Sequence, residues 1–194
     1  MENWPAAGKK WIDILRDTDM AITKKICMLG YYGVGKTSLV SQFVNNMFAD
    51  KYQTTVGVKI DKKVVEVDGR EIKLMLWDVA GEEDNTPVKL SHLKDAKGYL
   101  LVLDGRRRKT LEAAVSIQQR VETEVGKVPF LLLANKNDER ASWEVQDSDL
   151  ADLASRGWTV METSAKTGER VEEAFLTLTA GMLKVQDEDA EDDE

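Results

Sequence analysis

The sequence predicts a three-layer α/β fold, with a mostly parallel six-stranded sheet that carries one antiparallel edge strand. Short apolar runs alternate with helical patterns along the chain, as in a parallel sheet covered by helices. Two of the runs flank Asp68-Gly69, a hairpin signal that predicts the antiparallel pair. The first run leads into residues 30–37, GYYGVGKT, which have the form G-x-x-x-x-G-K-T between a strand and a helix.

The first half of the chain supplies the first strand, one helix and the antiparallel pair. The first strand is expected over residues 21–30, and a helical pattern follows over residues 38–44. Residues 47–57 have no clean period and are expected to form a loop. The two hairpin strands are marked by apolar residues at Val58, Ile60, Val64, Val65, Val67, Ile72, Leu74 and Leu76.

The second half continues the alternation. Thr86 and Pro87 are suited to be the N-cap and first residue of a short helix. Residues 99–103 and 128–133 are expected to be buried strands. Between them, one helical face carries Leu111, Ala114, Val115, Val121 and Val125.

The last elements bring the final motifs to the same edge of the sheet. A helix near residues 147–155 is expected to end at Gly157, followed by a strand over 158–161 and a helix over 169–184. Ligands of such sheets bind beyond the carboxyl ends of the strands. Each motif described below lies at such an end, so we expect one site there.

The composition is that of one globular domain with appendages. The chain has 194 residues, of which 42% are hydrophobic and 32% charged. No apolar run approaches the ~20 residues that span a bilayer, and the N-terminus lacks a signal-peptide pattern. The single cysteine, Cys27, excludes an internal disulfide framework and fits a reducing compartment. We therefore expect a cytoplasmic protein.

The net charge of −8 is concentrated at the C-terminus. Seven of the last eight residues are acidic, and the rest of the chain has 28 acidic against 27 basic residues. This balance does not favour nucleic acid or anionic membrane as a partner. The C-terminus carries no cysteine, so no lipid anchor is expected, and residues 186–194 are expected to form an acidic disordered tail.

Residues 1–20 form an N-terminal extension ahead of the body, residues 21–185. Trp11, Ile14 and Leu15 have the spacing of a short amphipathic helix. Two interpretations remain open. The helix could dock on the body and cover an apolar groove, or it could be an arm that binds a partner or touches a membrane, although its weak basic character argues against the membrane.

Residues 30–37 predict a phosphate-binding loop. Its glycines allow backbone N–H groups to form a nest for phosphate oxygens, and the following helix adds its positive dipole end. In this motif Lys36 would reach the β- and γ-phosphates and the Thr37 hydroxyl would bind Mg²⁺. The alternative is a glycine-rich turn with a chance lysine.

Four further motifs follow the phosphate loop in order, and together they resemble the Ras-like small GTPases. They are the threonine Thr55, Asp-x-x-Gly at residues 78–81, Asn-Lys-x-Asp at 135–138 and Ser-Ala-Lys at 164–166. Residues 76–81 and 162–168 look most like the Rab branch. The resemblance covers about residues 22–184 and implies a Ras-like G domain over residues 21–185 that binds GTP or GDP.

The resemblance implies a role for each motif. Asp138 would accept two hydrogen bonds from guanine, a pairing that adenine cannot offer. Thr55 and Gly81 would contact the γ-phosphate, while Mg²⁺, the expected cofactor, would be held by Thr37, Thr55 and, through water, Asp78. The implied nucleotide-binding residues are Gly33, Val34, Gly35, Lys36, Thr37, Ser38, Phe48, Thr55, Gly81, Asn135, Lys136, Asp138, Ser164, Ala165 and Lys166. The implied catalytic residues are Glu82, Lys36, Thr55 and Gly81.

The same resemblance implies two switch segments, residues 50–57 and 81–93. In such proteins these segments change with the γ-phosphate and bind effector and regulator proteins. We expect GTP/GDP and proteins as partners, without nucleic acid or a lipid anchor.

Two residues depart from the family pattern. Glu82 stands where the family usually has a glutamine that orients the attacking water. A glutamate adds negative charge and cannot donate to the phosphoryl group, which predicts slow hydrolysis. Alternatively Glu82 is a general base, or the water is held by Glu83 or Asn85. Tyr32 replaces a small glycine, and its ring either crowds the entry of a partner's arginine or turns to solvent.

Residues 106–109, RRRK, form a basic run at the start of a helix. They are expected to be a solvated cluster, which could pair with the acidic tail, or else to meet an acidic partner or reach the phosphates.

Three functional hypotheses follow from these motifs. The chain is interpreted as a GTP-hydrolysing switch, or alternatively as a hydrolysis-deficient sensor or scaffold. A P-loop kinase or ATPase is the third hypothesis, and residues 135–138 argue against it.

Overall fold

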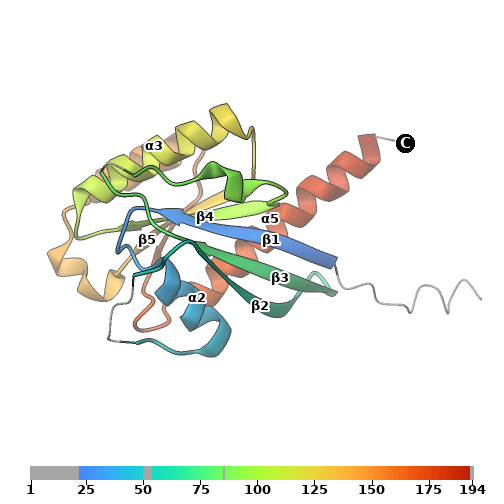
Figure 1. The fold of residues 1–194 in the computed structure, drawn as a ribbon, viewed down its shortest axis with the longest axis horizontal. Helices are drawn as coiled ribbons and strands as arrows, with labels where there is room; N and C mark the ends of the chain where they lie inside the picture. The colour runs from blue at the N-terminus through green and yellow to red at the C-terminus, as the bar shows by residue number, and fades with distance from the viewer. Residues whose placement is uncertain (1–21, 50–53, 85, 193–194) are drawn as a thin grey trace, which may run out of the picture.

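The computed structural model describes residues 22–49, 54–84 and 86–192 (Figure 1). The expected N-terminal helix and the first part of the first switch segment, residues 50–53, lie outside the described residues. Within the described part of the chain, none of the helices combines the length and apolar character that crossing a bilayer requires.

Six strands form one sheet in the order β2-β3-β1-β4-β5-β6. Every neighbouring pair is parallel except β2 and β3. This confirms the predicted mostly parallel α/β sheet with one antiparallel edge strand. The strands are β1 (Ile22–Gly30), β2 (Val58–Val67), β3 (Arg70–Val79), β4 (Gly98–Asp104), β5 (Phe130–Asn135) and β6 (Val160–Thr163).

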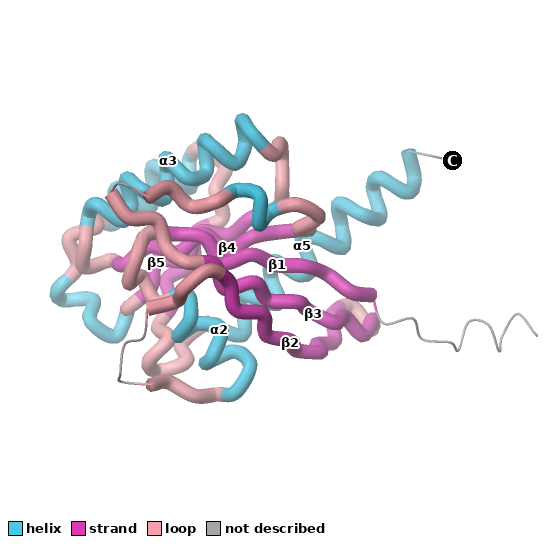
Figure 2. The backbone as a smooth tube through the Cα atoms, viewed as in Figure 1, coloured by secondary structure: helices cyan, strands magenta, loops and turns pink. Residues whose placement is uncertain are grey.

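Helices cover both faces of the sheet, which makes three layers (Figure 2). In β1, alternate residues serve the two faces. Ile26 and Met28 belong to the core beneath α2 and α5, whereas Cys27 and Leu29 belong to the core beneath α3 and α4. The helices are α2 (Lys36–Asn45), α3 (Arg108–Glu124), α4 (Asp147–Ser155) and α5 (Val171–Asp192), with short 3₁₀ turns η1 (Leu90–Leu93) and η2 (Asn137–Ser142).

The hairpin between β2 and β3 turns at the expected residues. Asp68 and Gly69 both have positive φ, 52° and 71°, as a tight type I′ turn requires. Val67 therefore pairs with Arg70, and β2 is left at the edge of the sheet.

Gly157 ends α4 as predicted, but the next strand begins later than expected. Gly157 has φ 87°, and its N–H donates to the Ala154 carbonyl while the Trp158 N–H donates to Leu153. This pair of bonds is a Schellman motif. Because Trp158 still closes the helix, β6 begins at Val160.

Thr86 and Pro87 do not open a helix. The Thr86 backbone exchanges two hydrogen bonds with Glu83, and the helical segment is the single 3₁₀ turn η1, which begins at Leu90. The prediction placed the turn about three residues too early, since this local pairing takes the backbone groups that a helix start would leave free.

The C-terminal prediction differs from the structure over residues 186–192. They were expected to be disordered, yet α5 continues to Asp192. Asp187 accepts two 3.1 Å hydrogen bonds from Arg70 at the hairpin, and Gln186 accepts one from Lys24 of β1. Lys24 is only 3% exposed. The next turn of the helix therefore has basic partners on the sheet.

Candidate nucleotide-binding site

A pocket of about 450 Å³ lies where the parallel strands end. Residues from every expected motif line it. They are Gly33, Gly35, Lys36, Thr37, Ser38, Phe48, Thr55, Gly81, Asn135, Lys136, Asp138, Ala165 and Lys166. Among the expected nucleotide and metal residues, Val34, Asp78 and Ser164 lie just behind this wall and hold it through hydrogen bonds.

The phosphate loop leaves β1 through a glycine that no other residue could replace without strain. Gly30 has φ 142°, and a β-carbon there would lie 2.3 Å from the carbonyl oxygen of Val102 in β4. The loop ends at Gly35, φ 102°, directly before α2. The N-terminus of α2 therefore points at the pocket, as an anion site requires.

Lys36 is buried and holds the loop from inside. Its ammonium donates to the carbonyls of Gly30 (3.1 Å) and Tyr31 (3.0 Å), and the side chain is only 6% exposed. Burial lowers its pKa to about 8, with the Asp78 carboxylate opposing the shift and Arg107 adding to it. A phosphate in the pocket would favour the charged form again.

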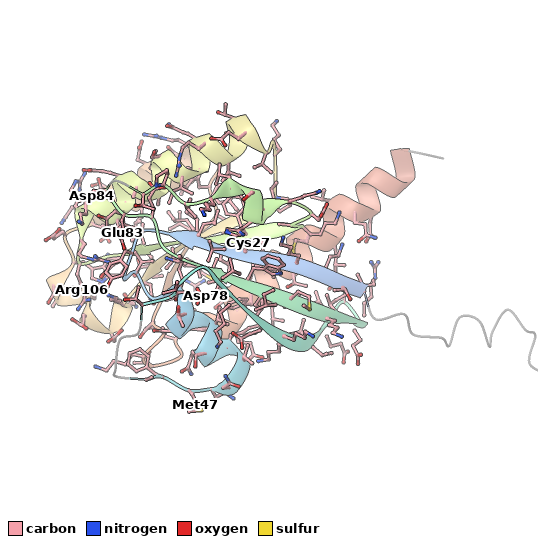
Figure 3. All side chains as sticks on the ribbon, viewed as in Figure 1. Cys27, Met47, Asp78, Glu83, Asp84 and Arg106 are labelled. Carbon is pink, nitrogen blue, oxygen red and sulfur yellow. The ribbon has the colours of Figure 1, made fainter. Side chains whose placement is uncertain are left out.

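Three oxygen ligands converge at one end of the pocket. The hydroxyls of Thr37 and Thr55 are 2.8 Å apart, and the Thr37 hydroxyl donates to Oδ2 of Asp78 at 2.5 Å. Asp78 is fully buried at the end of β3, and burial raises its pKa against the Thr37 hydrogen bond (Figure 3). Its Oδ1 is buried without a hydrogen-bond partner among the described residues.

These donors fit Mg²⁺. Magnesium prefers oxygen ligands, uses one or two carboxylates and keeps several waters together with substrate phosphates. Asp78 provides the single carboxylate, and its unpaired Oδ1 could accept from a metal-bound water. Among the described residues, no group of three or more histidines, cysteines or acids could form an all-protein metal cage.

Asn135 ties three loops together at the opposite end. Its amide donates to the Val34 carbonyl at 2.9 Å, and its oxygen accepts the Ala165 N–H at 3.1 Å. Asp138 is held beside them, because its Oδ1 accepts the Ser164 hydroxyl at 2.5 Å. The Asp138 Oδ2 lies 4.0 Å from the Lys166 ammonium. The two downstream motifs and the phosphate loop thus form one wall.

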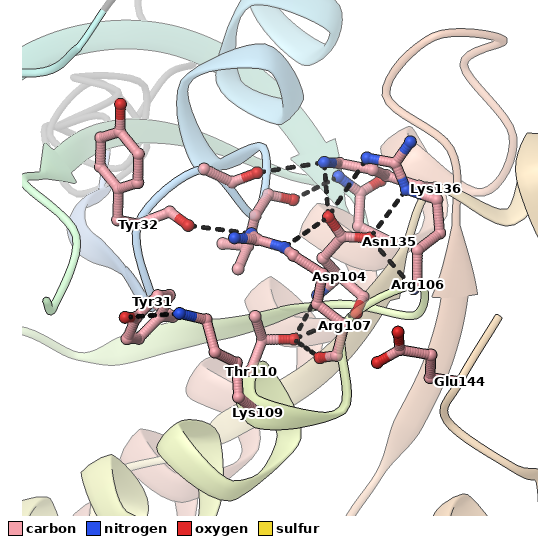
Figure 4. Close-up of polar contacts among 12 residues, drawn as sticks. Tyr31, Tyr32, Asp104, Arg106, Arg107, Lys109, Thr110, Asn135, Lys136 and Glu144 are labelled. Atoms are coloured by element: carbon pink, nitrogen blue, oxygen red, sulfur yellow. Dashed lines mark hydrogen bonds and ion pairs between the residues drawn. The ribbon is translucent and has the colours of Figure 1, made fainter. Parts of the chain in front are cut away.

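Asp104, at the end of β4, is a buried hub that the sequence interpretation did not identify (Figure 4). It is fully buried and accepts hydrogen bonds from Arg106, Arg107 and Lys136. Burial acts to raise the pKa of Asp104, but the bonds from Arg106 and Lys136 outweigh burial and hold this pKa below its usual range. The available signal was an acid at a strand end directly before a basic run.

The basic run 106–109 pairs with side chains of the body of the protein, and Arg108 and Lys109 are also exposed, as expected of a solvated cluster. Arg106 pairs with Asp104 and Glu139, Arg108 with Asp149, and Lys109 donates to the Tyr31 hydroxyl. Besides Tyr32, five pocket-lining residues were absent from the predicted site: Ser41, Ala49, Lys59, Arg106 and Glu139. Such residues carry no motif of their own.

Glu82 is the predicted catalytic residue that does not line the pocket. Its carboxylate pairs with Arg120 of α3 and accepts the Val88 N–H at 3.1 Å. Its backbone meets the phosphate loop instead, through Tyr32 N–H to Glu82 C=O (2.8 Å) and Glu82 N–H to Gly30 C=O (3.1 Å).

Gly81 and Tyr32, which lie beside Glu82 in this contact, close the end of the pocket near Lys36. A β-carbon at Gly81 would lie 2.7 Å from the Tyr32 Cα and 2.8 Å from the Lys36 ammonium, so only glycine fits there. Tyr32 lines the pocket, and its hydroxyl lies 3.5 Å from the Thr54 hydroxyl. This hydroxyl contact is exposed, and both interpretations of Tyr32 stay predictions.

Comparisons with known proteins agree with these motifs. The family model described as the Ras family matches residues 25–184. The chain is also 35% identical over 161 residues to the Ras-related protein Rab-13 of Canis lupus familiaris, which covers 82% of this chain and 79% of that protein.

Proposed function

This chain belongs to the Ras family of small GTPases, near its Rab branch, and from that premise we propose a GTP-binding switch that hydrolyses GTP slowly. One observation carries the second half of the proposal. The carboxylate at the position of the water-orienting glutamine is held away from the pocket by Arg120.

Guanine selectivity is assigned to Asp138. Its carboxylate is already fixed by Ser164, and it lies in the pocket beside Asn135 and Lys136. A base that cannot donate two hydrogen bonds would leave this carboxylate unpaired, which is costly. Phe48 and the Lys136 stem would cover the two sides of the base, and the Ala165 N–H would meet its oxygen.

The phosphates are assigned to the opposite end. The N–H groups of residues 33–38 and the Lys36 ammonium would hold them, with Thr37, Thr55 and Asp78 around Mg²⁺. When bound, the metal would neutralise charge on the β- and γ-phosphates. Lys36 would add a positive charge, because an entering phosphate would favour the protonated form of its amine.

Slow hydrolysis follows from the position of Glu82 relative to the expected γ-phosphate. A water-orienting group must reach the attacking water, and Glu82 is engaged by Arg120 and Val88 instead. If the carboxylate did swing inward, it would bring negative charge to a site that is already rich in it. Both positions of Glu82 therefore disfavour a fast intrinsic rate.

The two switch segments are proposed as the partner-binding surface. The first segment is tied to the residue that precedes the second, since the Ala80 N–H donates to the Gly57 carbonyl at 2.9 Å. The Thr55 hydroxyl also lies 2.8 Å from the Thr37 hydroxyl at the end of the phosphate loop. A γ-phosphate that moves Thr55 or Gly81 would therefore move both segments, 50–57 and 81–93. The G domain itself is proposed to span residues 21–185.

Two measurements test this proposal. Nucleotide released from the purified protein is identified by chromatography: GDP is expected, whereas adenine nucleotide would contradict guanine selectivity. Single-turnover hydrolysis of the native protein is then compared with Glu82→Gln. We expect the glutamine variant to be faster, and a native rate equal to or above it would refute slow hydrolysis by Glu82.

The second candidate is a sensor or scaffold that scarcely hydrolyses. Tyr32 supports it, since a ring at the pocket wall would crowd the approach of a partner's arginine. GTP as the co-purified nucleotide would support this candidate over the switch.

A further inference from the structure

One backbone carbonyl of the phosphate loop accepts a hydrogen bond from a residue outside the family motifs. The Tyr32 carbonyl accepts a 2.9 Å hydrogen bond from Nη2 of Arg107, which precedes the first residue of α3 (Figure 4). Arg107 is far from Tyr32 in sequence, so only the fold brings them together. Its guanidinium also lies against the loop, 3.5 Å from where a β-carbon of Gly33 would be.

The other carbonyls of this loop are also held. The Lys36 ammonium donates to the carbonyls of Gly30 and Tyr31. The Lys136 ammonium donates to the Gly33 carbonyl at 3.1 Å, and the Asn135 amide donates to the Val34 carbonyl at 2.9 Å. Arg107 therefore completes an unbroken series of held carbonyls over residues 30–34.

This series determines where the N–H groups point. In a trans peptide the C=O and the following N–H point in opposite directions, and the described residues contain no cis peptide. A carbonyl of Tyr32 held outward by Arg107 turns the Gly33 N–H to the other side, where Gly33 lines the pocket. A phosphate oxygen there would meet a donor that is already oriented.

Arg107 is itself fixed by the buried carboxylate that holds the base-end lysine. Its Nε donates to Oδ2 of Asp104 at 3.0 Å, and the same oxygen accepts the Lys136 ammonium at 2.6 Å. Since Asp104 is fully buried, this anchor is rigid. The charge of Arg107 is also felt inside the loop, where it adds to the lowering of the Lys36 pKa that burial begins.

We infer that Arg107 is a positioning residue for phosphate binding, which orients the Tyr32–Gly33 peptide so that its N–H receives the nucleotide. The inference rests on the proposed function, because it concerns the same pocket. Arg107 is not among the residues that line the pocket, so its action passes through the loop backbone.

The test compares Arg107→Ala and Arg107→Lys with Arg108→Ala as the matched control. Arg108 is adjacent and equally basic, but it pairs with Asp149 and does not touch the phosphate loop. Two quantities are measured with Mg²⁺ present: the dissociation rate of a fluorescent GDP analogue, and the ³¹P resonance of the β-phosphate of bound GDP.

We expect Arg107→Ala to release GDP about tenfold faster, the order of one hydrogen bond to a charged group, and to shift the β-phosphate resonance. Arg107→Lys should restore part of both, because an ammonium can still donate to the carbonyl. Arg108→Ala should match the native protein in both measurements.

Failure of the proposed function and failure of the inference about Arg107 would give different results. If native protein binds no guanine nucleotide, the proposed function itself fails. If the native protein binds GDP and Arg107→Ala binds it equally well with an unshifted resonance, only the inference fails. A lower thermal midpoint without a resonance shift, in either Arg107 variant, would assign Arg107 to stability and overturn the positioning role.

Discussion

At the base end of the pocket, the side chains that would meet the nucleotide are themselves held in place, whereas at the triphosphate end one expected side chain is held elsewhere. Asn135 and Asp138 are fixed by Val34, Ala165 and Ser164. Glu82 is fixed too, but by Arg120, outside the pocket. Selection of the nucleotide and its turnover are thus built from separate contacts, and one can change without the other.

The largest expected effect comes from a substitution at the base end of the pocket. Asp138→Ala should weaken GDP and GTP binding by about a hundredfold or more, because guanine loses its two acceptors. Binding is measured by calorimetry with each nucleotide. Glu139→Ala is the matched control, since Glu139 also lines the pocket but pairs with Arg106. Equal losses in both variants would show that selection is not concentrated at Asp138.

The next effect concerns the metal. Chelation of Mg²⁺, or Thr37→Ala, should accelerate GDP release about tenfold, because the phosphates lose a counter-charge that only this end supplies. Release is followed by the fluorescence of a GDP analogue with and without chelator. If the site is as described, Thr37→Ala should also lose most of its sensitivity to the chelator. A variant as sensitive as the native protein would contradict the assignment of Thr37.

Lys36 gives the triphosphate end of the pocket a pH dependence. Its pKa of about 8 lies below the ordinary lysine value of 10.5 because of burial. Nucleotide should restore the charge, so GDP affinity should fall by severalfold as the pH rises from about 7 to 9. The unfolding free energy of nucleotide-free protein should instead rise above pH 8, where the unfolded state binds the extra proton.

Affinity measured across this pH range in native protein and in Lys36→Arg provides the check. An arginine stays charged throughout, so its affinity, whatever its level, should not follow the same pH curve. A parallel decline in both proteins would assign the pH dependence to another group.

The smallest expected effect concerns the ion pair between Arg120 and Glu82. Arg120→Ala should lower the unfolding free energy by about 1 kcal/mol, since the pair with Glu82 is only partly buried. GDP affinity should stay within about twofold, because neither residue lines the pocket. Chemical unfolding and calorimetry measure the two quantities. A large loss of affinity would show that the two ends are coupled after all.

Much of the fold and of the base end could be predicted from local patterns. Apolar alternation indicates the strands, Asp68-Gly69 the hairpin and Gly157 the end of α4, because each depends on neighbours in sequence. The motifs place Asn135 and Asp138 because strand ends share one edge of the sheet.

The missed features depend on contacts between distant parts of the chain. Glu82 meets Arg120 only because α3 packs beside the second switch segment, and Arg107 meets Tyr32 only because β4 ends beside the phosphate loop. The acidic end of α5 looks disordered by composition, but there Asp187 pairs with Arg70 and Gln186 with Lys24, both distant in sequence. No periodicity along the sequence carries such pairings.

The last turns of α5 also bear on how shortened versions of this protein should be designed. Lys24 is almost completely enclosed, and Gln186 is the side chain that accepts its hydrogen bond. A version cut at residue 185 would remove the hydrogen-bond acceptor of the Lys24 ammonium and the carboxylate partner of Arg70. Preparations for crystallisation or spectroscopy should therefore keep the chain at least through Asp187, even though composition alone suggests removing it.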